Sequence, residues 1–188
     1  MRLMNIKYMV LFIGLSNLTL GLKILIGYRR VNFIEALKIT RRGNIFRNPA
    51  FDGDANDIAS AQIGNGVYLS MNPTGFDGRQ GDWWCYVAAE MRPLAKTPKV
   101  WINESLWNKP EIKIAAFVQT KLHKGESASS AIRMSQAMYY SEGTIQMLIP
   151  TQMVQNNTLQ TAAHCYRYYH DLPVRRAVEY DSWAGFRN

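Results

Sequence analysis

The stretch GNGVYLS, from Gly64 to Ser70, decides the expected fold. Its two glycines permit a tight, close-packed start to a strand. The residues that follow alternate aliphatic with hydroxyl-bearing side chains, so Tyr68 and Ser70 face the same side of that strand. An aromatic ring and a hydroxyl on one strand face, with Tyr28 and Arg29 earlier in the chain, suit a pocket that stacks a flat ring and binds a phosphate.

The composition is that of a basic globular protein with a sizeable core. Of the 188 residues, 47% are hydrophobic and 12% aromatic, which excludes extensive disorder and predicts one domain. Lysine and arginine outnumber the acids 22 to 14, which gives a formal net charge of +8. That excess is compatible with a soluble basic surface, acidic partners, nucleic acid or an anionic membrane.

Nucleic acid is the less favoured of these partners, because the basic residues are scattered along the chain rather than massed. A short aromatic segment near the C-terminus could stack bases, but the sequence shows no basic stripe around it. Its residues are Tyr166, Tyr168, Tyr169 and His170.

The cysteines and histidines indicate no metal centre. Cys85 and Cys165 are too few for a disulfide scaffold, so they either form one bridge in an exported protein or remain two free thiols. The sequence has no CxxC or HExxH spacing, and its three histidines form no ligand set with the cysteines. We therefore predict no bound metal.

Residues 1–23 have the pattern of an export segment. Arg2 and Lys7 precede an apolar run that begins at Tyr8, which is the order found in secretory signals. The run is too short and too interrupted to span a membrane, and no small-residue cleavage site follows it. A helix or strand packed on the domain is the alternative. We expect the folded domain to comprise residues 24–188.

The rest of the chain mixes short strands and helices out of strict β-α-β alternation, which predicts an α+β fold. Asn32 and Gly43 cap one predicted helix. Strands are expected over 24–29, 66–70, 99–102, 144–149 and 174–180, helices over 33–42, 110–122 and 128–138, a turn of helix over 58–63, and loops over 48–57 and 72–82. The segments 83–89 and 165–169 fit either a strand or a helix.

Three separated motifs together resemble the ADP-ribosyltransferase superfamily. They are Tyr28-Arg29 at the end of a first strand, GNGVYLS in a middle strand, and TIQMLIP over 144–150 as a later strand followed by proline. GNGVYLS is similar to the G-x-G-[IV]-Y-[FL] stretch of the poly-ADP-ribose branch, where the tyrosine stacks on nicotinamide. The resemblance covers roughly residues 24–150. It implies a split, mostly antiparallel mixed sheet with flanking helices and NAD in a central cleft.

The resemblance also implies which residues bind NAD. In the family, the first strand supplies an arginine or histidine, the middle strand a serine or tyrosine, and a later strand an acid. An arginine can bind the pyrophosphate through two hydrogen bonds, and an acid favours the positively charged transition state. The expected NAD contacts in this sequence are Arg29, Arg30, Gly66, Tyr68, Ser70 and Gln146.

The position of the family's acid holds Gln146, which has the hydrogen-bonding shape of an acid but no charge. Three explanations are open. Glu142, four residues earlier, acts from a loop; an acid from elsewhere in the chain substitutes; or the protein binds NAD without efficient turnover.

The HopF and EspJ group of type III secreted bacterial effectors departs from the family pattern in this way. These ADP-ribosyltransferase-like proteins modify host kinases and use an arginine and a late aspartate. Asp171 matches the late aspartate, and Arg79 is a further arginine of that kind, so the catalytic candidates are Arg29, Arg79, Glu142 and Asp171.

The resemblance therefore implies a secreted effector or toxin that acts in a host cell and transfers ADP-ribose from NAD to a host protein such as a kinase. One alternative is a catalytically degenerate module of the same fold that binds a host protein. Another is an RNA-directed transferase, which the positive charge would suit.

Overall fold

The computed structural model describes residues 21–50, 52, 61–138, 140 and 143–187. The described residues form one eight-stranded mixed sheet and four α-helices, which confirms the predicted α+β class. The strands are β1 (Lys23–Val31), β2 (Gly66–Ser70), β3 (Trp83–Glu90), β4 (Lys99–Trp101), β5 (Ile132–Gln136), β6 (Ile145–Pro150), β7 (Ala162–Tyr166) and β8 (Phe186–Arg187). The helices are α1 (Phe33–Arg42), α3 (Met91–Lys96), α4 (Glu111–Thr120) and α5 (Thr151–Gln155).

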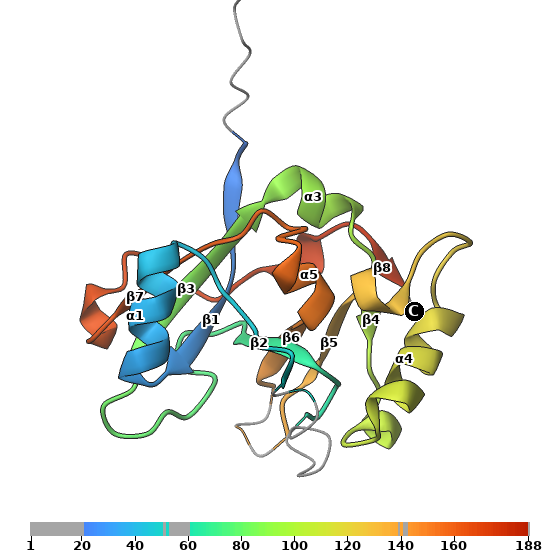
Figure 1. Ribbon diagram of the computed structural model, residues 1–188, viewed down its shortest axis with the longest axis horizontal. Coiled ribbons are helices and arrows are strands. Elements are labelled where there is room, and N and C mark those ends of the chain that lie inside the picture. The colour runs from blue at the N-terminus through green and yellow to red at the C-terminus, as the bar shows by residue number, and fades with distance from the viewer. Residues whose placement is uncertain (1–20, 51, 53–60, 139, 141–142, 188) are drawn as a thin grey trace, which may run out of the picture.

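The sheet narrows at its middle, between β1 and β2. Its strand order is β7-β3-β1-β2-β6-β5-β4-β8, and within the described chain β1 and β2 pair only through Tyr28 and Ser70. We call β7-β3-β1 the first half of the sheet and β2-β6-β5-β4-β8 the second half. The first half is antiparallel throughout, whereas β4 in the second half runs parallel to β5 and β8. Figure 1 shows α1 in front of the first half and α4 beside the outer strands of the second.

The predicted caps of α1 are confirmed. The Asn32 side chain accepts a hydrogen bond from the backbone N–H of Glu35 at 3.0 Å, and Gly43 ends the helix in the left-handed conformation at φ 65°. The helix buries Ala36 and Ile39 against β3 and β7. Because Asn32 directly follows β1, this cap fixes α1 next to the end of that strand.

The GNGVYLS stretch folds as predicted, with β2 beginning at its second glycine. Gly66 lies so close to the carbonyl of Ile149 in β6 that a Cβ at this position would collide with it. Gly64 has a φ of 109°, and a Cβ there would collide with the guanidinium of Arg133. The two glycines therefore allow the close approach of β2 to β6 and to a buried arginine.

Of the two segments that fitted either a strand or a helix, 83–89 is a strand, and only the first two residues of 165–169 are. Residues 83–89 lie in β3, while β7 ends at Tyr166 and a short 3-10 turn, η3 (Tyr169–Asp171), follows it. Cys85 and Cys165 stand opposite each other in β3 and β7 and form a disulfide, so the pair are not free thiols.

The helix predicted over 128–138 is wrong. Residues 128–130 form a 3-10 turn and Ile132–Gln136 form β5. Arg133 and Ser135 are both buried in this strand. The Arg133 guanidinium donates to Glu111, although its Nε has no partner in the described chain, and Ser135 accepts from Gln146. The helix predicted over 110–122 is α4, which buries Ile114 and Val118 but leaves Ile112 78% exposed.

The strand predicted over 174–180 is also wrong. This segment crosses β1, where the Tyr28 hydroxyl donates to the carbonyls of Arg176 at 2.7 Å and Val174 at 3.3 Å. The backbone N–H of Val178 donates to the carbonyl of Met71 at 2.9 Å. These bonds replace a strand ladder, and the last strand is β8.

Several predictions fall outside the described residues in whole or in part. Residues 1–20, most of the predicted loop over 48–57 and the first part of the predicted turn over 58–63 are among them. Within those segments, Ala50 and Asp52 are helical, and Gln62 and Ile63 form a turn. β1 begins at Lys23, one residue before the predicted start of the domain.

Candidate functional site

A cavity of about 390 Å³ lies where the two halves of the sheet meet. Its strand residues are Arg29 and Arg30 from β1, Tyr68 from β2 and Gln146 from β6. Its other lining residues are Gln62, Phe76, Asp77, Asn108, Met138 and Tyr140. The volume falls within the range of small-molecule sites, which is about 300–1,000 Å³.

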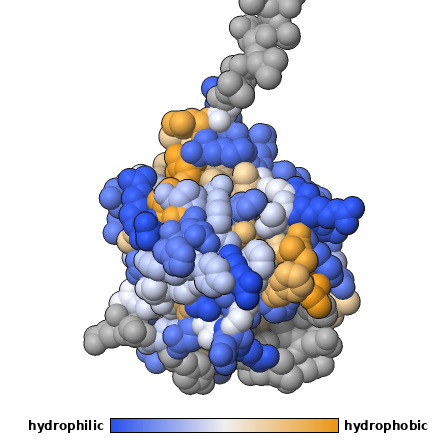
Figure 2. Space-filling model, turned by 90° about the vertical axis from the view of Figure 1, so that its left-hand side faces the viewer, coloured by the Kyte–Doolittle hydropathy of each residue, from blue (hydrophilic) through white to orange (hydrophobic). Residues whose placement is uncertain are grey.

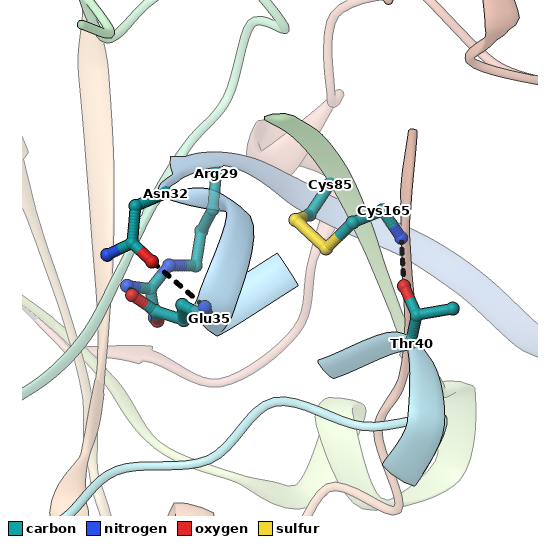
Figure 3. Close-up of a disulfide and its surroundings, with 6 residues drawn as sticks. All are labelled: Arg29, Asn32, Glu35, Thr40, Cys85 and Cys165. Carbon is teal, nitrogen blue, oxygen red and sulfur yellow. Dashed lines mark hydrogen bonds and ion pairs between the residues drawn. A yellow bond between two sulfur atoms is a disulfide. The ribbon is translucent and has the colours of Figure 1, made fainter. Parts of the chain in front are cut away.

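Arg29 lines the cavity but already has an anionic partner. Its guanidinium makes an ion pair with Glu35 at 3.0 Å, and Figure 3 shows the two side chains directed toward each other at the start of α1. Burial lowers the pKa of Arg29, with Glu35 opposing the shift and Arg47 adding to it. Glu35, in the first turn of α1, therefore largely balances the charge of Arg29.

Arg30 makes no ion pair among the described residues. Its guanidinium lies 3.7 Å from the centroid of the Trp84 ring, and its Nη2 is 3.5 Å from the carbonyl of Asp82, a long and weak hydrogen bond. Its Nε is buried without a hydrogen-bond partner in the described chain. Arg30 is therefore better placed than Arg29 to bind an anion in the cavity.

Tyr68 forms a wall of the cavity, and its ring is held by its hydroxyl. The hydroxyl donates to the carbonyl of Gly64 at 2.8 Å and accepts from the N–H of Ile63 at 2.9 Å. Burial raises the pKa of the hydroxyl, so Tyr68 stays neutral. Because these two bonds occupy the hydroxyl, the ring face is the part of Tyr68 that can contact a ligand.

Gln146 is 4% exposed, and its neighbours require an amide at this position. Its Nε2 donates to Ser135 Oγ at 3.0 Å and to the carbonyl of Gln136 at 3.3 Å. Ser135 Oγ itself donates to that same carbonyl, so it accepts from Gln146. The Oε1 atom has no hydrogen bond within the described part of the chain and remains available to the cavity. A carboxylate here would face the Gln136 carbonyl with no proton to donate.

Four predicted site residues lie outside the cavity lining. Ser70 is 1% exposed, and its Oγ accepts from the N–H of Asn72 at 3.2 Å. Gly66 contacts β6 instead. Arg79 has an exposed side chain, and Asp171 lies exposed in η3, where it is 3.5 Å from His170. A fifth candidate, Glu142, lies outside the described residues.

Sequence reasoning missed the acid of the cavity. Among the described lining residues, Asp77 carries the only carboxylate. It lies beside an aromatic pair, Phe76 and Tyr140, whose ring centroids are 5.1 Å apart. Burial raises the pKa of Tyr140, and the charge of Asp77 raises it further. The predicted glycine-rich loop over 72–82 was the available signal, because such loops permit close approach to a ligand.

The described residues contain no group of three histidines, cysteines or acids placed to bind a metal ion. None of the helices in the described ranges is long and apolar enough to cross a membrane.

Comparison with known proteins places the chain in a family. Residues 61–188, most of the chain, match a family of unknown function (DUF5910), and the protein belongs to that family. The matched region contains β2, β6 and the loop that carries Asp77, but not β1 with its two arginines. No curated protein matches the sequence.

Proposed function

We propose that the protein is an ADP-ribosyltransferase-like domain that binds NAD in the cavity between the two halves of the sheet. One observation carries this proposal. The three motifs of the resemblance lie far apart in sequence, yet β1, β2 and β6 are neighbouring strands and all contribute side chains to one cavity. The order of contributions is the one the resemblance implies, with arginine from β1, tyrosine from β2 and the altered acid position from β6.

Each side chain suits a part of the dinucleotide. The fixed ring of Tyr68 offers a flat surface for nicotinamide, and Arg30 offers a guanidinium for the pyrophosphate. The Oε1 of Gln146 can accept a hydrogen bond from a ribose hydroxyl. Arg29 also lines the cavity and can contribute to pyrophosphate binding, although its guanidinium is paired with Glu35.

Asp77 is the residue best suited to assist transfer. The bond between nicotinamide and ribose C1′ breaks with its electron pair leaving on nicotinamide, so positive charge develops on the sugar. A nucleophilic atom of the acceptor forms the new bond to C1′ and releases its proton to solvent. Gln146 carries no charge, and Asp77 supplies the negative charge that Gln146 lacks.

We propose further that the protein is a secreted effector or toxin whose acceptor is a host protein, such as a kinase. The disulfide between Cys85 and Cys165 supports export, because disulfides persist in oxidising compartments. The net charge of +8 suits an acidic acceptor surface.

A second candidate is the non-catalytic module that binds a host protein. The bonds of Gln146 favour it, since they make a glutamine rather than an acid the stable choice at that position. In this case the cavity binds NAD, or only its nicotinamide end, without transfer.

Calorimetry with NAD tests the binding step. We expect wild-type protein to bind NAD, and Arg30→Gln to weaken binding about 10- to 100-fold, the effect of losing a charge-assisted hydrogen bond. Arg41→Gln is the matched control, because Arg41 lies exposed in the last turn of α1 outside the cavity lining. No heat from folded wild-type protein would refute the proposal.

Labelled NAD and host lysate separate the two candidates. We expect Asp77→Asn to lose label transfer while still binding NAD, and Arg79→Ala and Asp171→Ala to retain it. Binding without transfer by the wild type would favour the module. Loss of transfer in Asp171→Ala but not in Asp77→Asn would show that the late aspartate of the resemblance acts, and not Asp77.

A further inference from the structure

A second surface lies on the outer face of β3 and β7, away from α1. In β3, Cys85 and Val87 point into the core, so Trp84 and Tyr86 point to the opposite side. The register pairs Trp84 with Tyr166 and Tyr86 with His164. Two neighbouring strands thus present four aromatic side chains on one face, and all four are half-buried.

The aromatic surface continues past the end of β7. Tyr169 lies edge-on to Trp84, with ring centroids 5.1 Å apart, and Tyr168 stacks on His170 at 5.4 Å. Tyr168 is 50% exposed and Tyr169 is 36% exposed. We call these residues together the aromatic face: Trp84, Tyr86, His164, Tyr166, Tyr168, Tyr169 and His170.

Arginines border the aromatic face on several sides. Arg167 lies 5.3 Å from the centroid of Tyr168, Arg175 lies 5.8 Å from that of Tyr169, and Arg30 covers Trp84. None of the three makes an ion pair in the described part of the chain, and Arg167 and Arg175 are exposed. One acid, Asp171, lies at this face, 3.5 Å from His170. Burial raises the pKa of Tyr166, and Tyr86 and the charge of Asp171 add to the shift.

The fold therefore assembles the basic border that the sequence does not show. The three arginines come from β1, from the residue after β7 and from the C-terminal segment, up to 145 residues apart in the numbering (30 against 175). Figure 2, which faces the β7 side of the molecule, shows residues of intermediate hydropathy lying among strongly hydrophilic ones.

We propose that the aromatic face binds single-stranded nucleic acid. The bases stack on rings of the aromatic face, including those of Tyr86 and Tyr166, and the phosphates contact Arg167 and Arg175. Every base has a π-face, so this mode tolerates any sequence, and side chains on an open sheet face are a common way to bind splayed bases. The arginines favour an anionic chain over a neutral carbohydrate, and a duplex would hide the base faces that the rings need.

This inference goes beyond the proposed function and does not depend on it. The aromatic face makes its contacts outside the NAD cavity, and only Arg30 borders both. Binding is therefore measured without NAD, and NAD calorimetry on the same variants shows whether the cavity is intact.

Fluorescence anisotropy with a labelled 12-nucleotide oligouridine tests the stacking. We expect Tyr86→Ala and Tyr166→Ala each to weaken binding about 5- to 100-fold. Tyr86→Phe and Tyr166→Phe keep the ring and should keep the affinity, which separates stacking from a change in folding. Phe33→Ala is the matched control, because Phe33 is 52% exposed on α1, against the other face of the sheet.

The salt dependence tests the phosphate contacts. Arg167→Gln and Arg175→Gln should each reduce the slope of log affinity against log salt by about 0.7. Arg41→Gln on α1 should leave the slope unchanged. Equal binding of the matching duplex, equal competition by heparin, or alanine variants that bind oligouridine as well as wild type would each overturn the proposal. A neutral glucan that binds when oligouridine does not would assign the face to carbohydrate instead.

Discussion

The two halves of the sheet are stabilised in different ways. In the first half, the Cys85–Cys165 disulfide joins β3 to β7 under α1, and the backbone N–H of Cys165 donates to Thr40 of that helix at 3.2 Å (Figure 3). In the second half, buried cations connect the elements. Arg133 in β5 is 2% exposed and bonds both carboxylate oxygens of Glu111, at 2.6 and 2.9 Å.

The difference matters because the candidate site lies between the halves. The first half supplies Arg29 and Arg30, and the second supplies Tyr68 and Gln146. Glu111 also accepts from the N–H of Asn65, in the turn whose backbone bonds the Tyr68 hydroxyl. The cavity therefore depends on a covalent bridge on one side and on an ion pair on the other. The disulfide and the ion pair share no residue, so each can be removed by substitutions that leave the other in place.

Removing Glu111 should lower the free energy of unfolding more than any of the other changes proposed below. Glu111→Ala leaves the Arg133 guanidinium buried without a carboxylate, which typically costs about 3–5 kcal/mol. We expect the urea midpoint to fall accordingly, with an unchanged slope. Glu104→Ala is the control, because Glu104 is an exposed acid in the 3-10 turn before α4.

A double variant sharpens this test. Glu111→Leu with Arg133→Met replaces the pair by apolar side chains and should lose less stability than Glu111→Ala alone. If the single and double variants are equally unstable, the contact itself, rather than the stranded charge, would be what stabilises the second half.

Breaking the disulfide should cause the next largest loss of stability. The Cys85→Ala, Cys165→Ala double variant opens a link across 80 residues, and native disulfides commonly contribute about 2–4 kcal/mol. Thermal unfolding with and without reductant measures the loss, and the double variant should no longer respond to reductant. A wild-type protein whose unfolding temperature is unchanged by reductant would mean that pairing with β3 and packing under α1 hold β7 without the bridge.

Much of the first half could be predicted from the sequence because its signals are local. Asn32 and Gly43 mark both ends of α1. One element of the second half has a local signal of the same kind, because the glycines of GNGVYLS mark the start of β2. Each of these signals is a single residue whose type favours a particular backbone geometry, so it can be recognised in the sequence without knowledge of the fold.

The second half was predicted less well because its polar residues bond across the fold. The helix predicted over 128–138 was wrong because the chain there forms a buried strand. Its polar residues Arg133 and Ser135 bond Glu111 and Gln146, which lie elsewhere in the sequence. The cavity acid was missed for the same reason. Asp77 is one of several loop acids in the sequence, and only the meeting of β1, β2 and β6 selects it.

The smallest effect concerns Lys99, the other buried cation of the second half. Its Nζ donates to the carbonyls of Leu94, Thr97 and Ala184, and burial, with a smaller effect of Arg187, lowers its pKa from 10.5 to about 8. The unfolded chain therefore binds more protons between these two values, so stability rises with pH across that window. From pH 7 to 9.5 we expect wild type to gain about 2 kcal/mol relative to Lys99→Met, measured by urea unfolding at both pH values. A constant difference would show that the three carbonyls keep the ammonium charged throughout this pH range.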